Sequence, residues 1–190
     1  MLKAAKFASY VVASCVLAGF SGVTHADEFQ YGGISLGQAE SKDFCDDISG
    51  PGMSCDDNAL TGRIYGGAVF DKYMAFEGGY RYIDDMSIGA ADVSYHMFDG
   101  SLLLFVPDLG PVRFFGKVGA QFWQQDFGGT ASSIDSERGV SLRTGLGAVI
   151  DITDNVGLRA EWDYLKSVGE GHSNLKSDMH IFSVGPELRF

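Results

Sequence analysis

Residues 112–124 read VRFFGKVGAQFWQ, and polar and apolar side chains alternate along this stretch. One face of an extended chain would carry Phe114, Val118, Ala120 and Phe122, and the opposite face Arg113, Lys117 and Gln121. Successive side chains of a β-strand point to opposite faces of the sheet. The stretch therefore predicts a strand with one apolar face and one charged face.

The same two-residue period recurs along the chain. It predicts eight strands, at about 29–38, 59–70, 73–83, 93–106, 112–124, 139–151, 156–166 and 177–190. The chain contains 26 glycines and only four prolines, and no linker or low-complexity tract interrupts the pattern. These features indicate one all-β domain.

The connections between the predicted strands alternate in length. Short connections fall at 71–72, 107–111 and 153–155, and longer ones at 39–58, 84–92, 125–138 and 167–176. Short turns on one rim and long loops on the other are typical of bacterial outer-membrane barrels, in which an even strand number places both termini on the periplasmic side. The pattern predicts an eight-stranded antiparallel up-and-down transmembrane β-barrel.

Alternation alone does not decide which face is inside, because a soluble lipocalin-like barrel also alternates. The interior of an eight-stranded barrel is only wide enough for side chains to fill it. The apolar face is rich in Phe, Tyr and Trp, which suit a lipid-facing band with interfacial aromatic girdles. Glycines recur on the charged face, where space beside long side chains is short: Gly33, Gly37, Gly67, Gly79, Gly119, Gly145, Gly147, Gly157 and Gly185. We therefore expect the charged face to line the lumen.

The amino terminus predicts export. Lys3 and Lys6 precede an apolar stretch, and Thr24-His25-Ala26 ends in a small residue where a signal peptidase would cut. We predict a signal peptide at 1–26 and a barrel domain at 27–190, in the outer membrane of a Gram-negative cell. An uncleaved anchor is one alternative, and lipidation of Cys15 is another.

Cys45 and Cys55 are the two cysteines after the predicted signal peptide, and in an oxidising periplasm they predict a disulfide. Acidic residues surround them in the first loop: Glu40, Asp43, Asp46, Asp47, Asp56 and Asp57. Calcium binding is an alternative for these hard oxygens, but we expect a solvated loop, with no metal and no cofactor. The net charge of −11 argues against nucleic acid as a partner.

Several short motifs resemble the transmembrane barrel of the outer membrane protein A family. They are Tyr31-Gly32-Gly33-Ile34-Ser35-Leu36-Gly37, Ile64-Tyr65-Gly66-Gly67, Phe76-Glu77-Gly78-Gly79-Tyr80, Gly116-Lys117-Val118-Gly119 and Leu158-Arg159-Ala160-Glu161-Trp162. The final Glu187-Leu188-Arg189-Phe190 resembles the aromatic signal that the β-barrel assembly machinery recognises. The chain ends at Phe190, so we expect the family's peptidoglycan-binding domain to be absent.

The resemblance also implies a set of charges in the lumen. Family members pair carboxylates with basic residues as a gate, and Glu77, Lys117 and Arg159 stand at similar positions, but the expected carboxylate on the sixth strand is replaced by Val149. Glu161 or Asp163 could substitute for it. We predict a lumen salt-bridge cluster of Glu77, Lys117, Arg159 and Glu161, either as a static plug or as a switchable ion path.

No nucleophile–histidine pair accompanies the histidines. The outer-membrane deacylases require a His-x-Ser spacing, and His96, His172 and His180 do not have it, so we expect them in loops or at the membrane interface. The sequence predicts a monomeric, non-enzymatic outer-membrane protein with a structural or surface-interaction role. It would contact outer-membrane lipids and lipopolysaccharide, and loops 39–58 and 125–138 would meet a host or surface ligand. The alternatives are a narrow ion channel and a lipid-modifying enzyme.

Overall fold

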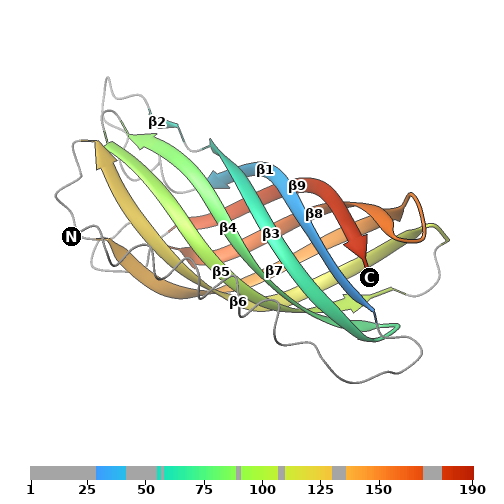
Figure 1. Ribbon diagram of the computed structural model, residues 1–190. Coiled ribbons are helices and arrows are strands. Elements are labelled where there is room, and N and C mark those ends of the chain that lie inside the picture. The colour runs from blue at the N-terminus through green and yellow to red at the C-terminus, as the bar shows by residue number, and fades with distance from the viewer. Residues whose placement is uncertain are drawn as a thin grey trace, which may run out of the picture.

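The computed structural model describes residues 29–41, 55–56, 58–88, 91–106, 110–129, 136–168 and 177–190, and in them the chain forms a closed barrel (Figure 1). The strands are β1 (Gln30–Ser41), β2 (Cys55–Asp56), β3 (Asn58–Asp71), β4 (Met74–Ile88), β5 (Ala91–Phe105), β6 (Val112–Gly129), β7 (Glu137–Asp151), β8 (Val156–Val168) and β9 (Ser177–Arg189). Neighbouring strands pair antiparallel, and β1 closes the barrel against β9. The predicted eight-stranded antiparallel barrel is confirmed, with the two-residue β2 added beside β4.

The strands are longer at the loop end than the sequence predicted. The connection expected over 84–92 is wrong, because β4 and β5 stay paired up to Ile88 and Ala91. Likewise β6 continues to Gly129, inside the loop expected over 125–138. Towards the loop end, the polar side chains of Asp84, Asp85 and Asp126 face outward and the apolar side chains of Met86 and Trp123 face inward, which is the reverse of the pattern in the rest of the barrel.

Some predictions concern residues that lie outside the described part. These are the signal peptide at 1–26, Cys15, Cys45, most of loop 39–58, and His172. The backbone of Cys55 is described within β2, but its side chain is not, so the disulfide stays a prediction. No helix in the described ranges is long and apolar enough to cross a membrane.

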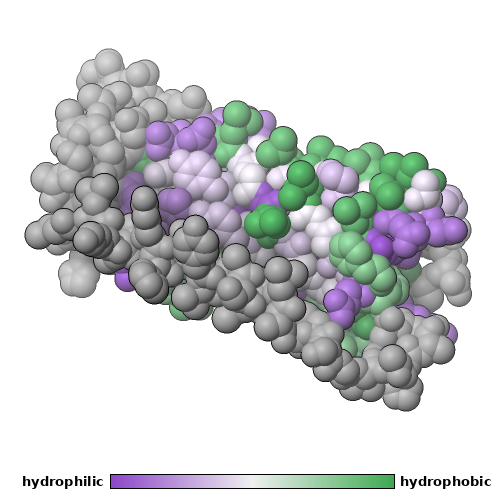
Figure 2. All heavy atoms as spheres, in the orientation of Figure 1, coloured by the Kyte–Doolittle hydropathy of each residue, from purple (hydrophilic) through white to green (hydrophobic). Residues whose placement is uncertain are grey.

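The outer face of the barrel is apolar around its middle. Phe114, Val118 and Phe122, which the sequence placed on the apolar face of β6, are 45%, 45% and 43% exposed. Exposed side chains from the other strands continue this band, among them Leu36, Leu60, Ile64, Phe76, Leu104, Leu142, Leu146, Ile150, Leu158, Phe182, Val184 and Leu188. On the face that Figure 2 shows, apolar residues gather over the centre and upper right, and polar residues collect at both ends.

Aromatic side chains border this band on the side of the long loops. Tyr80 and Tyr82 of β4 lie beside His96 of β5, and Trp162 and Tyr164 of β8 lie beside His180 of β9. Such a girdle is typical of the level where hydrocarbon meets headgroups. The structure thus places His96 and His180 at this level.

The strands are longer than a membrane requires. At roughly 3.3 Å per residue, the 18 residues of β6 extend over roughly 60 Å, or roughly 45 Å along the axis at the usual barrel tilt. The apolar band of an outer-membrane barrel is only about 25 Å tall. The loop end of the barrel therefore extends well beyond the hydrocarbon.

Candidate functional site

The lumen is the most distinctive part of the molecule, and its side chains form three layers. From the turn end to the loop end of the lumen, an apolar cluster comes first, then an ionic cluster, then a second apolar cluster. The members come from positions that alternate with the lipid-facing residues, as a strand requires. We call these the turn-end apolar layer, the ionic layer and the loop-end apolar layer.

The two apolar layers close the lumen on either side of the charges. The turn-end layer comprises Tyr31, Tyr65, Val69, Ala75, Leu103, Phe115 and Val149, with Phe29 and Phe105 packed against it. The loop-end layer comprises Ala39, Ala59, Ile83, Met86, Val93, Tyr95, Met97, Trp123, Leu165, Val168, Met179 and Ile181. All residues of both layers except Phe29 and Phe105 are less than one tenth exposed, so each layer is a packed section of core.

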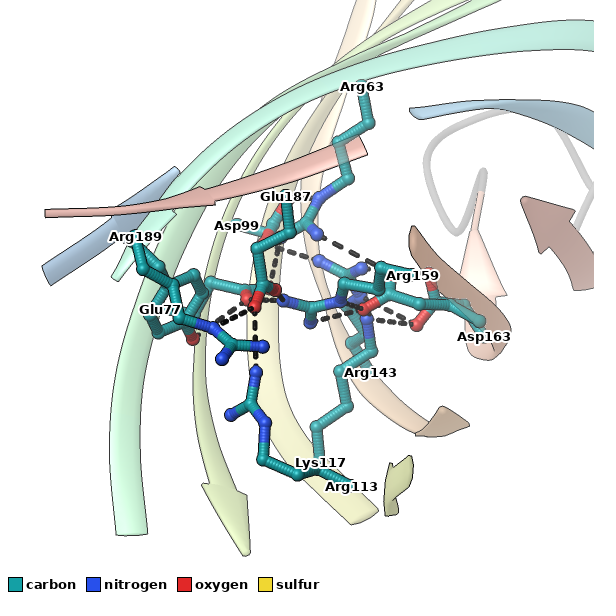
Figure 3. Close-up of polar contacts among 12 residues, drawn as sticks. Arg63, Glu77, Asp99, Arg113, Lys117, Arg143, Arg159, Asp163, Glu187 and Arg189 are labelled. Atoms are coloured by element: carbon teal, nitrogen blue, oxygen red, sulfur yellow. Dashed lines mark hydrogen bonds and ion pairs between the residues drawn. The ribbon is translucent and has the colours of Figure 1, made fainter. Parts of the chain in front are cut away.

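The ionic layer contains five cations and five carboxylates that are almost fully buried, and the partly exposed Arg113 and Arg189 also pair with Glu187. Its cations are Arg63, Arg81, Lys117, Arg143 and Arg159, and its carboxylates are Glu77, Asp99, Glu161, Asp163 and Glu187. Each of these side chains is at most 2% exposed and forms at least one ion pair. Buried charges of this kind persist only when they are paired and hydrogen-bonded. Figure 3 shows most of the network, which draws its members from both sides of the barrel.

Three carboxylates organise the ionic layer. Glu77 accepts from Arg63 at 2.9 Å, lies 2.7 Å from Arg159, and accepts the Tyr31 hydroxyl at 3.0 Å. Glu161 lies 2.9 Å from the Nζ of Lys117 and also pairs with Arg159.

Asp163 contacts three cations at once: Lys117 at 2.7 Å, Arg143 at 2.8 Å and Arg81 at 2.6 Å. Because each carboxylate serves several cations, the network has no isolated pair whose loss would leave the rest unchanged.

Arg159 lies at the boundary between the ionic layer and the turn-end apolar layer. Its guanidinium carbon lies 4.4 Å from the ring centre of Phe115 and 4.6 Å from that of Tyr65. Such contacts are favourable for a desolvated guanidinium. Arg159 thus faces carboxylates on one side and aromatic rings on the other, and joins the two layers.

Glycines on the lumen face make room for these side chains. A Cβ atom built on Gly145 would lie 2.7 Å from Asp163 Oδ1 and 2.9 Å from Lys117 Cε. One built on Gly79 would lie 2.9 Å from Arg63 Nη2. These contacts are closer than a real Cβ atom tolerates. The lumen face is therefore crowded at these glycines, as the sequence indicated.

The structure brings together all four residues of the predicted lumen cluster. Glu77 meets Arg159, and Lys117 meets Glu161. Val149, which stands where the family carries a carboxylate, belongs to the turn-end apolar layer, and the cations nearby use Glu161 and Asp163 instead.

The prediction of this cluster was incomplete. It omitted Arg63, Arg81, Asp99, Arg143 and Glu187, and it named Asp163 only as an alternative to Glu161. The sequence could have identified Asp99 as a lumen residue, because it is the only Asp, Glu, Lys or Arg in the strand predicted at 93–106.

Phe190 lies at the turn end and is 76% exposed, and its backbone N–H donates to the carbonyl of Gln30 at 2.9 Å. The last residue is therefore tied to the first strand while its ring remains accessible. Among the described residues, no group of three or more His, Cys, Asp or Glu side chains is arranged to hold a metal ion.

A family model described as the OmpA-like transmembrane domain matches residues 25–190. The chain belongs to this family. Outer membrane protein A of Escherichia coli O157:H7 is 25% identical over 95% of the chain, and that of Salmonella typhi is 26% identical over 95%. The chain spans about half the length of these relatives, 54% in both cases.

Solved structures of other outer-membrane barrels share the fold of this OmpA-like chain. Neisserial surface protein A aligns with a TM-score of 0.63 and 17% identity, covering 86% of this chain and 97% of that one. Ail of Yersinia pestis aligns with a TM-score of 0.55 and 14% identity, with the same coverage. At this identity the likeness shows the barrel architecture alone.

Proposed function

We propose that this OmpA-like barrel is a non-enzymatic, non-conducting protein of the outer membrane with a structural and surface-interaction role. The observation that carries the proposal is the layered lumen. An ion crossing it would have to pass two packed apolar layers and an ionic layer whose described charges are already paired. Moving a charge into an apolar layer without water or a partner is costly.

Planar-bilayer recording tests the absence of a pore. Purified wild-type protein should give no discrete conductance steps, and the double variant Met97→Gly/Trp123→Gly, which thins the loop-end layer, should also stay silent because the ionic layer remains. Regular steps from the wild type would overturn the proposal. Heat-dependent gel mobility confirms that each preparation is folded.

A narrow channel is the second candidate, and one contact favours it. Lys117 lies between Glu161 at 2.9 Å and Asp163 at 2.7 Å, so its ammonium could exchange partners along the axis. Recordings of Glu77→Ala and Arg159→Ala decide between the two. Traces identical to wild type leave only the plug, whereas new conductance supports a switchable path.

The proposal includes the route to the membrane. Residues 1–26 would act as a signal peptide removed on export, and residues 27–190 would fold as the barrel. The accessible Phe190 ring would serve recognition by the assembly machinery. The protein would act as a monomer in contact with outer-membrane lipids and lipopolysaccharide.

Surface interaction would occur at the loop end. Outward-facing side chains beyond the aromatic girdle are mostly acidic, including Glu40, Asp84, Asp85, Asp126 and Asp178, against Arg138 and Lys166. Ail of Yersinia pestis has been crystallised with the heparin analogue sucrose octasulfate. The net charge of −11 and the acidic rim favour a different chemistry here, a neutral or cationic ligand at loops 39–58 and 125–138.

The absence of enzymatic activity is also part of the proposal. His96 accepts or donates a 2.6 Å hydrogen bond with Tyr80, and lies 3.7 Å from Asp126 on the lipid-facing side. We interpret this group as an interfacial anchor. Mass spectrometry of lipid A from overexpressing cells should show no change in acylation, and a shifted acyl pattern that depends on His96 would contradict the proposal.

A further inference from the structure

The apolar outer face has an indentation on β1, β3 and β4 near the loop end. Leu36, Gly62 and Tyr82 lie side by side in one hydrogen-bonded row across these strands. Gly62 faces outward, and a Cβ built on it would meet only Leu36 Cδ2, at 3.7 Å. A large side chain on either side of a glycine leaves a notch in the row.

The notch opens into a groove of about 500 Å³. Leu36, Leu60 and Tyr82 form its walls, and Gly62 forms its floor. Its loop-side end is polar, with Gln38 and Asp84. The groove therefore changes from apolar to polar over a short distance, at the level of the aromatic girdle.

The position of the groove determines what covers it. Leu36 and Leu60 are 72% and 73% exposed, and Ile34 and Ile64 continue the same surface towards the turn end. The groove is thus continuous with the lipid-facing band of an outer-membrane barrel. In the membrane its contents are the acyl chains of the leaflet on the loop side.

The polar end of the groove restricts which kind of acyl chain can bind there. The Tyr82 hydroxyl donates to Asp84 Oδ1 at 3.4 Å, and Gln38 Nε2 donates to Asn58 Oδ1 at 3.3 Å. These bonds leave carboxylate and amide oxygens as acceptors at the mouth of the groove. An ester linkage offers acceptors only, so it supplies no donor for these oxygens, whereas an amide N–H or a hydroxyl does.

We propose that this groove binds one acyl chain of an outer-leaflet glycolipid, a chain that is amide-linked or hydroxylated near its head. This inference rests on the proposed placement of the barrel in the outer membrane, in contact with lipopolysaccharide. The hydrocarbon lies over Gly62 between Leu36 and Tyr82, and its N–H or O–H donates to Asp84 and Gln38. The contact of the hydrocarbon with the side chains contributes binding free energy. The hydrogen bonds at the head distinguish an amide-linked or hydroxylated chain from an ester-linked chain.

Native mass spectrometry with two probes tests the proposal. The folded full chain in detergent micelles is mixed with lipid A, which has amide-linked hydroxyacyl chains, or with dipalmitoyl phosphatidylglycerol, which has ester-linked chains. The protein is then released from the micelles, and the lipid that stays bound is measured. Wild-type protein should retain one lipid A more strongly than the phospholipid. Equal retention of the two would overturn the assignment of the polar end.

Matched variants locate the site. Gly62→Leu fills the groove and should weaken lipid A retention about tenfold, the effect of losing contact with roughly two methylenes. Gly66→Leu is the control, because Gly66 also faces outward on β3 and a Cβ there meets only the Tyr31 carbonyl at 3.7 Å. Equal retention by the two variants would place the lipid elsewhere and overturn the proposal.

Two further variants keep the test decisive if Gly62→Leu fails to fold. Leu60→Ala removes a wall and should weaken retention of both lipids. Asp84→Leu removes the acceptor and should reduce the preference for lipid A over the phospholipid while leaving phospholipid retention unchanged. An unchanged preference in Asp84→Leu contradicts the proposed hydrogen bond.

Discussion

Arg159 Nη1 of β8 lies 2.7 Å from Glu77 Oε2 of β4, and this ion pair spans the closed lumen. The same carboxylate reaches Arg63 on β3 and Tyr31 on β1. One side chain therefore connects four strands that pair mainly through their backbones elsewhere. We infer that Glu77 contributes more to stability than any single contact on the outer face of the barrel.

The first prediction follows from this position. Glu77→Ala should destabilise the barrel by about 3–5 kcal/mol, because it leaves Arg63 and Arg159 buried without one of their carboxylates. Urea unfolding in lipid bilayers, followed by tryptophan fluorescence, measures the change. Glu40→Ala, at an exposed outward position, is the control and should stay within about 0.5 kcal/mol of wild type. A Glu77 variant as stable as this control would show that the ionic layer is not a source of stability.

The second prediction concerns the space on the lumen face. Gly145→Ala should cost about 1–3 kcal/mol, since the added methyl group collides with Asp163 and Lys117 and must displace them. Gly116→Ala, on the lipid-facing side, adds a methyl group at an ordinary 3.7 Å from Leu146 and should be nearly neutral. The same unfolding assay compares the two. Equal effects would mean that the lumen has more room than the side-chain positions allow.

The sequence predicts which face of each strand points to lipid, because one alternation of apolar and polar residues holds over the membrane part of the barrel. Phe114, Val118 and Phe122 alternate with Arg113, Lys117 and Gln121, and this continuous apolar face suits lipid, whereas the narrow interior holds large side chains where glycines stand beside them. The fold followed from that pattern, and the ion-pair partners of Lys117 followed from a family resemblance.

The loop end could not be predicted in the same way, because there the rule reverses. From the girdle to the loop end, Ile83, Met97 and Trp123 point into the lumen, whereas Gln124 and Asp126 point outward, as in a soluble barrel. A prediction that expects polar residues inside along the whole strand therefore ends the strands before their true loop-side ends. Which cation pairs with which carboxylate also depends on distances across the lumen. Strand periodicity gives no information about these distances.

The third prediction tests which face meets lipid. Leu146→Arg places a charge in the middle of the lipid-facing band of β7, where Leu146 is 61% exposed, and should cost about 2–4 kcal/mol. Gln124→Arg faces outward as well, but lies beyond the apolar band, and should cost at most about 1 kcal/mol. Unfolding in bilayers measures both. If the two variants behave alike, the boundary of the membrane does not lie between these residues.

The fourth prediction concerns the loop-end apolar layer, which is the part of the lumen that sequence analysis missed. Trp123 is 1% exposed within this layer, and its neighbour Phe122 is 43% exposed on the lipid-facing side. Trp123→Ala should cost about 3–5 kcal/mol, because it opens a cavity among packed side chains. Phe122→Ala should cost distinctly less, since lipid chains move into the space that the ring leaves.

The comparison also checks that the layer closes the lumen. Both variants are unfolded in bilayers at the same lipid composition, and hydrogen exchange of the Met97 and Ile181 backbone amides reports on the neighbourhood of the mutated site. Faster exchange should accompany Trp123→Ala and be absent from Phe122→Ala. A Trp123 variant as mild as the Phe122 variant, with unchanged exchange, would mean that the inward apolar side chains do not form a packed core and that the barrel is sealed by its charges alone.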